Sequence, residues 1–200
     1  MNKVESALSR TTDTKALVIG IETLPRVADM FKELFPGRRA LVVADANTWR
    51  AAGGDVHRIL AQAGVAQDEP HVFTDPKLYA EWTFVEQLDG VLSRTDAIPV
   101  AVGSGVINDL TKLCSHHNGR RYMVVGTAAS MDGPCSAISV LYHEDGSFDR
   151  YLMLEKNPDL VVVDTNVVAA APLRMTVAGM GDALATYFEA RSCAAAHGTN

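Results

Sequence analysis

Residues 98–112 combine a short apolar run, a Gly-Ser-Gly turn and the opening of a helix, and this order of parts most constrains the fold. The run at 98–102 is typical of a buried parallel strand, and we expect the helix to begin at Asn108 or Asp109. The two glycines of the turn allow a ligand to approach the backbone, and a helix start offers unpaired N–H groups and the positive end of its dipole. A phosphate site therefore competes with an ordinary strand-to-helix turn, because Asn108 stands where the third glycine of G-x-G-x-x-G belongs.

Elsewhere along the chain, short β-branched runs alternate with segments of helical periodicity. Strands are expected at 16–19, 40–44, 71–73, 98–102, 122–125 and 160–164. Helices are expected between them at 24–35, 48–63, 79–93 and 108–117. This order predicts a Rossmann-like α/β fold, in which a parallel, doubly wound sheet carries helices on both faces.

Towards the end of the chain the rhythm changes. Two strands at 136–142 and 148–154 flank a Glu-Asp-Gly turn and predict a β-hairpin. From Leu173 the chain is alanine-rich and helical. We therefore predict an α/β domain at 1–168, followed at 169–200 by the beginning of an all-helical domain.

Composition and charge argue against several classes of function. A net charge of −6 without a basic stripe argues against a nucleic-acid partner. The three cysteines are widely spaced and form no C-x-x-C motif, so the sequence indicates neither a disulfide framework nor a cysteine zinc site. No apolar run reaches the length of a signal-peptide core or a membrane span. We therefore expect a cytoplasmic protein without membrane association.

Three polar segments follow a strand or open a helix, and each has a structural alternative. Asp45 follows a strand directly, where a carboxylate can accept hydrogen bonds from an adenosine ribose or can merely cap the loop, and Asn47 and Thr48 could equally cap the next helix. Residues 127–133 follow another strand end and form either part of a ligand site or a polar turn. Asp182 is either functional or a helix cap. Asp45 comes 58 positions before Gly103, the reverse of the usual dinucleotide order.

Three motifs together resemble the superfamily of glycerol dehydrogenases, iron-containing alcohol dehydrogenases and dehydroquinate synthases. They are GSGVIND at 103–109, TAASMD at 127–132 and GDALATYFEA at 181–190. The similarity runs from about Asp13 to the end of the chain. An acid that precedes the glycine turn is the order that this superfamily shows, so the resemblance favours a functional interpretation of Asp45.

The resemblance implies an N-terminal NAD-binding domain, a C-terminal helical domain and an active site in the cleft between them. The pyrophosphate of NAD would lie against Gly103, Ser104, Gly105, Asn108 and Asp109. Asp45 would hold the adenosine ribose, and Thr127 and Ser130 would lie on the nicotinamide side. Asp132 would meet the substrate hydroxyls as the catalytic residue. A divalent metal, zinc in the glycerol dehydrogenases, would be held by Asp182 and by two histidines that have no counterpart in this sequence.

The activity that the resemblance implies is that of a metal-dependent, NAD-linked polyol dehydrogenase, an oxidoreductase similar to glycerol dehydrogenase that converts a secondary hydroxyl to a ketone by hydride transfer. Two alternatives stay open: sn-glycerol-1-phosphate dehydrogenase, which the N-terminal half resembles more through residues 104–112 and 128–133, and a dehydroquinate synthase-type lyase. The partner would be a small polyol or glycerol phosphate, and the full-length enzyme is expected to be a homo-oligomer. Because the two histidines are missing, we expect these 200 residues to be part of a longer enzyme, and a nucleotide-binding fragment without turnover is the non-enzymatic alternative.

Overall fold

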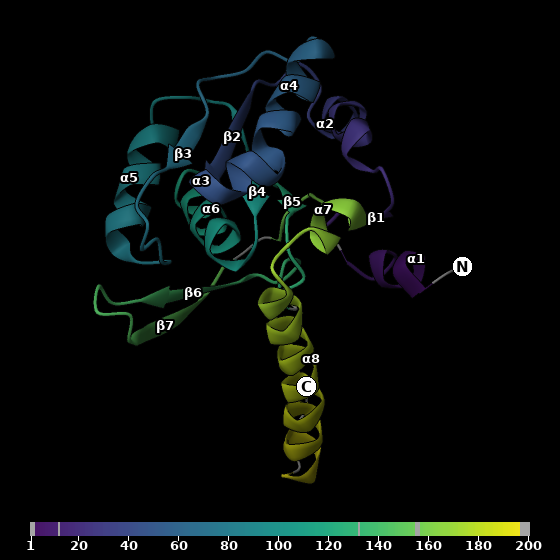
Figure 1. The fold of residues 1–200 in the computed structure, drawn as a ribbon, viewed down its shortest axis with the longest axis vertical. Helices are drawn as coiled ribbons and strands as arrows, with labels where there is room; N and C mark the ends of the chain where they lie inside the picture. Colours follow the sequence, from purple (N-terminus) through teal and green to yellow (C-terminus); the bar gives the residue numbers. More distant parts are fainter. Residues whose placement is uncertain (1–2, 12, 132, 155–156, 197–200) are drawn as a thin grey trace.

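Six parallel strands form the central sheet of this protein (Figure 1). The computed structural model describes residues 3–11, 13–131, 133–154 and 157–196. The strands lie in the order β1-β8-β5-β4-β2-β3. Their bounds are β1 (Ala16–Gly20), β2 (Ala40–Asp45), β3 (His71–Phe73), β4 (Ile98–Gly103), β5 (Met123–Gly126) and β8 (Leu160–Asp164). The parallel α/β sheet that the alternating pattern predicted is confirmed.

Helices cover both faces of the sheet, as predicted. The main ones are α2 (Val27–Leu34), α4 (Gly54–Gln62), α5 (Trp82–Leu92) and α6 (Gly105–His117). Ala40, Val42 and Ala44 of β2 are buried in the core that α2 and α4 cover. Leu41 and Val43 of the same strand are buried in the core that α5 and α6 cover. Because successive strand side chains point to opposite faces, one continuous apolar run contributes to both cores.

Helix α6 begins earlier than the sequence pattern predicted. It starts at Gly105 instead of Asn108 or Asp109. The N–H of Asn108 donates to the Ser104 carbonyl at 3.0 Å, so the first helical turn follows the glycine turn without an intervening loop. The side chain of Ser104, the N-cap residue, makes no capping hydrogen bond, which explains why the cap-based expectation placed the boundary too late.

The helix expected at 48–63 is interrupted by a π-helical turn. The segment is divided into α3 (Ala46–Thr48), η2 (Trp49–Gly53) and α4. A Cβ on Gly53 would lie 3.0 Å from Cε3 of Trp49, so the glycine lets the indole ring pack against the turn. The prediction was therefore correct that this segment is helical, but wrong that it forms one continuous α-helix.

Three short helical elements were not predicted as separate units: α1 (Lys3–Leu8), η1 (Leu24–Arg26) and α7 (Thr165–Ala169). The carboxylate of Asp164 accepts hydrogen bonds from the N–H of Asn166 and from that of Leu24, both at 3.0 Å. Burial alone would raise the pKa of Asp164, but these backbone donors hold it below its usual range. One carboxylate thereby joins the ends of β8 and η1.

A hairpin and a long helix complete the described chain. β6 (Ile138–Tyr142) and β7 (Phe148–Met153) pair antiparallel, which confirms the predicted hairpin. α8 (Leu173–Ala195) runs away from the α/β layers (Figure 1). Its large exposed apolar side chains are Leu173, Val177, Met180, Leu184, Tyr187 and Phe188.

The division into domains at 1–168 and 169–200 stays a prediction. Among the described residues, none of the helices has both the length and the apolar character needed to cross a membrane.

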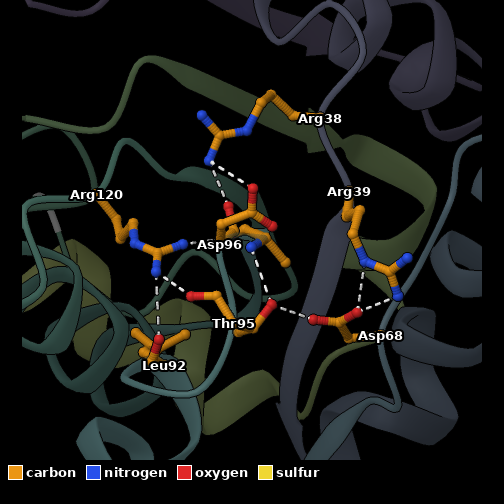
Figure 2. A network of polar contacts seen from close by, with 8 residues as sticks. Arg38, Arg39, Asp68, Leu92, Thr95, Asp96 and Arg120 are labelled. Carbon is orange, nitrogen blue, oxygen red and sulfur yellow. Dashed lines mark hydrogen bonds and ion pairs between the residues drawn. The ribbon is translucent and has the colours of Figure 1, made fainter.

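A polar network joins the loops that precede β2, β4 and β5 (Figure 2). Arg120 donates to the carbonyls of Leu92, at 3.4 Å, and Thr95. Nε of Arg39 donates to Asp68 Oδ1 at 2.7 Å, and Asp68 also accepts from the Thr95 hydroxyl. The hydrogen bond from Thr95, together with Arg39, holds the pKa of Asp68 below its usual range. These arginines hold the amino edge of the sheet, away from the edge that carries the candidate site.

Candidate functional site

The connections that leave β2 and β4 diverge and open a crevice at the carboxyl edge of the sheet. β2 leads through α3 and α4 to β3 on one side, whereas β4 leads through α6 to β5 on the other. Open α/β sheets bind ligands at such a switch point. Val43 lies opposite Ala101, and the same register sets Asp45 level with Gly103. The sheet therefore brings two candidates to one place although many residues separate them in sequence.

A cleft of 380 Å³ occupies this switch point. It is lined by Asp45, Ala46, Asn47, Thr74, Asp75, Pro76, Leu78, Ser104, Val106 and Ile107. These residues come from the ends of β2 and β3 and from the start of α6. Two carboxylates, Asp45 and Asp75, lie on this cleft, and the second was not among the residues that the sequence singled out.

Asp45 is a helix cap in this structure. Its Oδ1 accepts from the N–H groups of Asn47, at 2.7 Å, and Thr48, at 3.0 Å. The hydroxyl of Thr48 accepts in return from the Asp45 N–H at 3.0 Å, which completes a capping box. The cap interpretation is thus confirmed. It leaves room for the ribose hypothesis, because both bonds to the carboxylate end on Oδ1.

The two glycines of the Gly-Ser-Gly turn have different roles. A Cβ on Gly103 would lie 2.5 Å from Cβ of Ile107, closer than side chains tolerate. A Cβ on Gly105 would find its nearest neighbour, Cγ of Met131, at 3.7 Å. Gly103 is therefore required by the packing of α6 against β4, whereas Gly105 has free space before it at the helix start, where backbone N–H groups are unpaired.

Asn108 is 1% exposed, and neither Oδ1 nor Nδ2 finds a partner among the described residues. It lies on a second cavity, of 170 Å³, whose other walls include Gly103, Gly126, Ala128 and Pro134. A buried amide without hydrogen bonds is costly. The cavity is therefore a place where water or a ligand group would satisfy the side chain.

Asp109 lies on a third cavity, of 630 Å³. Its walls are Ala80, Gly105, Val106, Asp109, Met131, Gly133, Ser136, Ile138, Val140, Tyr142, Tyr151 and Asp182. Burial raises the pKa of Asp109, and Lys112, whose Nζ lies 3.3 Å from Oδ1, opposes this shift. Val106 lines both this cavity and the 380 Å³ cleft, so the two adjoin at the start of α6.

The 127–132 segment lies beside these cavities. Thr127 is buried, and its N–H donates to the Gly103 carbonyl at 3.0 Å. Neither Thr127 nor Ser130 is among the residues lining the three cavities, although Met131 lines two of them. Asp132 lies outside the described residues, and the next residue, Gly133, lines the 630 Å³ cavity.

Asp182 lies in the interior of α8, which begins at Leu173. The helix-cap interpretation of this carboxylate is therefore wrong. Asp182 lies on the 630 Å³ cavity, across from α6 and the hairpin. Within the described part of the chain, no group of three or more His, Cys, Asp or Glu side chains could hold a metal ion.

The hairpin wall of the 630 Å³ cavity was not predicted from the sequence. Ile138, Val140 and Tyr142 of β6 line it together with Tyr151 of β7. Positions 138, 140 and 142 share one face of a strand because strand side chains alternate. That alternation was visible in the sequence, but the position of this face beside α6 was not.

Comparison with known proteins shows that the chain is similar to alcohol and glycerol dehydrogenases. The sequence profile described as iron-containing alcohol dehydrogenase matches residues 18–172. A glycerol dehydrogenase of Pseudomonas putida is 43% identical over 175 residues, which are 88% of this chain and 47% of the relative. One from Escherichia coli O6:H1 is 36% identical over 175 residues, 87% of this chain and 46% of the relative.

Among solved structures, a probable glycerol dehydrogenase from Sinorhizobium meliloti 1021 is similar with a TM-score of 0.76 and 35% sequence identity, over 88% of this chain and 46% of that one. The chain thus spans less than half the length of each of these relatives.

Proposed function

Because the chain belongs to the iron-containing alcohol dehydrogenase family, we propose that it forms the nucleotide-binding part of an NAD-linked polyol dehydrogenase. Such an enzyme oxidises a secondary hydroxyl to a ketone and transfers the hydride to NAD. The observation that carries this proposal is the pair of adjoining clefts at the start of α6. One is polar and lies at the switch point, and the other combines an apolar hairpin wall with two carboxylates.

The proposed path of NAD follows these clefts. The adenosine ribose would donate to Asp45, and the pyrophosphate would lie over Ser104 and Gly105, where the helix start offers N–H groups. The nicotinamide would enter the larger cavity, where Ile138 and Val140 offer an apolar surface. The remaining proposed contacts are Gly103, Asn108, Asp109, Thr127 and Ser130.

The substrate is proposed to be an uncharged polyol. Asp109 and Asp182 line the larger cavity, and none of the described residues that line it is a lysine, arginine or histidine. Carboxylates accept hydrogen bonds from hydroxyl groups but repel a phosphate or a carboxylate at close range. This charge pattern favours a polyol over glycerol 1-phosphate and over the anionic substrate of a dehydroquinate synthase-type lyase. Asp132 is proposed to contact the same hydroxyls.

Asp182 is proposed as one ligand of a divalent metal. A catalytic zinc ion normally has three protein ligands and one open position. The described residues do not provide such a set, so they do not fit the complete metal site.

We expect the chain to bind NADH more tightly than NADPH. A 2′-phosphate would meet the carboxylates of Asp45 and Asp75, whereas a free 2′-hydroxyl can donate to Asp45. Asp45→Asn should reduce the preference by about tenfold, the effect of losing one hydrogen bond to a charged group. Asparagine caps helices as well as aspartate does, so α3 should persist. Fluorescence titration with both nucleotides measures the ratio, and equal or tighter NADPH binding by the unmodified chain would contradict the Asp45 assignment.

Gly105→Val should prevent NADH binding while the fold persists. The new side chain has space at its Cβ, but it would occupy the space over the helix start where the pyrophosphate is proposed to lie. The free energy of unfolding should change by less than about 1 kcal/mol. Gly90→Val in α5, where an added Cβ meets no atom within 4 Å, is the matched control and should bind NADH normally. Normal binding by Gly105→Val would reduce the glycine turn to a structural feature.

A further inference from the structure

Lys112 places a cation in the interior of the protein. Its side chain is 1% exposed, on helix α6. Nζ donates to the carbonyl of Ile138 at 2.5 Å and lies 3.3 Å from Oδ1 of Asp109. Burial lowers the pKa of Lys112, while the Asp109 carboxylate opposes this shift. A lysine is rarely buried so completely unless it is paired.

Both partners of Lys112 belong to the walls of the 630 Å³ cavity. Asp109 lines the cavity with a side chain that is 14% exposed. Ile138 lines it with its side chain and gives its carbonyl to Lys112. The next residue, Ser139, is fully buried, and its hydroxyl donates to the Asp109 carbonyl at 3.2 Å. Lys112 therefore lies behind two walls of the cavity and contacts both.

We propose that Lys112 is a positioning residue, which fixes the Asp109 carboxylate and strand β6 in the arrangement that receives the nicotinamide end of the cofactor. This inference rests on the proposed function, because it assumes that the larger cavity holds that end. Lys112 touches neither cofactor nor substrate and acts through Asp109 and the Ile138 backbone. The Asp109 carboxylate would then stay ionised, so that it accepts hydrogen bonds, and would stay in a fixed position.

An ordinary buried ion pair is the competing explanation. Such a pair can often be replaced by apolar residues without loss of stability, whereas removing one partner leaves an uncompensated charge. The two explanations differ in what happens to ligand binding as the pH changes. Among the described residues, the titratable groups near Asp109 besides Lys112 are Tyr122, Cys135 and, across the cavity, Tyr142, Tyr151 and Asp182.

The test compares NADH affinity between pH 6 and pH 9 in the 200-residue chain and its variants. Lys112→Met removes the charge that opposes the upward shift of the Asp109 pKa. Asp109 should then take up a proton as the pH falls through its higher pKa, so affinity should fall with pH while the unmodified chain changes little. At pH 7 the variant should bind NADH about tenfold more weakly, the loss expected for one hydrogen bond to a charged group.

Thr111→Val is the matched control, because Thr111 is fully buried on the same helix and its hydroxyl has no partner among the described residues. It should bind NADH with unchanged affinity. Hydrogen exchange tests the effect of Lys112 on strand β6. Amides of β6 should exchange faster in Lys112→Met, while those of β4 and β5 keep their protection. Should the single variant fail to fold, Asp109→Asn/Lys112→Met leaves no unpaired charge and should bind weakly with a flat pH profile.

If Lys112→Met bound NADH as tightly as the control Thr111→Val, this result would overturn the inference. Weaker binding with an unchanged pH profile and unchanged β6 exchange would also overturn it, since that outcome indicates a general loss of structure. Tight binding by the double variant would do the same. Failure of the unmodified chain to bind NADH contradicts the proposed function instead, and it is detected before any variant is compared. The exchange of β6 then still tests whether Lys112 anchors the hairpin.

Discussion

Alanine at position 103 is expected to destabilise the fold by about 1–3 kcal/mol and to remove NADH binding. The new Cβ would lie 2.5 Å from Cβ of Ile107 and 2.8 Å and 2.9 Å from its two γ carbons. Neither side can move freely: β4 is paired with β2 and β5, and the Gly103 carbonyl accepts from the N–H of Thr127 at 3.0 Å. Relief would require α6 to shift away from the strand, and its unpaired N–H groups would move with it.

Urea denaturation and NADH titration measure the two effects of Gly103→Ala. Gly90→Ala is the control, since an added Cβ there meets no atom within 4 Å. It should slightly stabilise the protein because alanine favours a helix. Truncation of Ile107 to alanine in the Gly103→Ala background should restore little, because the closest contact is to the Cβ that alanine keeps. An unchanged denaturation midpoint together with unchanged affinity would contradict the packing argument.

Alanine at position 179 is expected to detach the first turns of α8 from the segment that carries Ala129. A Cβ on Gly179 would lie 2.1 Å from the carbonyl oxygen of Ala129 and 3.3 Å from the carbonyl carbon of Ser130. Backbone atoms cannot move aside as a flexible side chain does. Because Asp182 follows one turn later on the cavity, the displacement should also disturb the larger cleft.

Gly181→Ala is an unusually close control for this prediction. It changes the same residue type in the same helix, but an added Cβ would meet no atom within 4 Å. The helix propensity alone should stabilise this variant by about 0.5–1 kcal/mol. Hydrogen exchange of residues 173–181 should therefore become faster in Gly179→Ala and slower in Gly181→Ala. The same change in both variants would mean that α8 does not rest on the Ala129 backbone.

The fold was predictable because its signals are local. A five-residue apolar run such as 40–44 in β2 fills two cores, and a strand followed by a glycine turn and a helix implies a parallel sheet. Boundaries were less predictable where a contact decides them. The start of α6 at Gly105 has no capping hydrogen bond from its N-cap side chain, and the π-helical turn at Gly53 depends on the Trp49 ring. The candidate site was predicted in part, since Asp45 and Gly103 carry motif signals, whereas Asp132 lies outside the described residues.

Local sequence patterns were sufficient to predict the parallel sheet, the hairpin and the glycine turn, because hydrophobic periodicity and glycine act over a few neighbouring residues. Tertiary structure alone decided which side chains share a cavity. The β2–β4 register brought Asp45 level with Gly103, and packing joined Lys112 to the Ile138 carbonyl and Gly179 to Ala129. Such pairs are distant in sequence, and the local sequence around one residue does not indicate which residue it will contact. Their contact depends on how whole helices and strands pack, which no short pattern records.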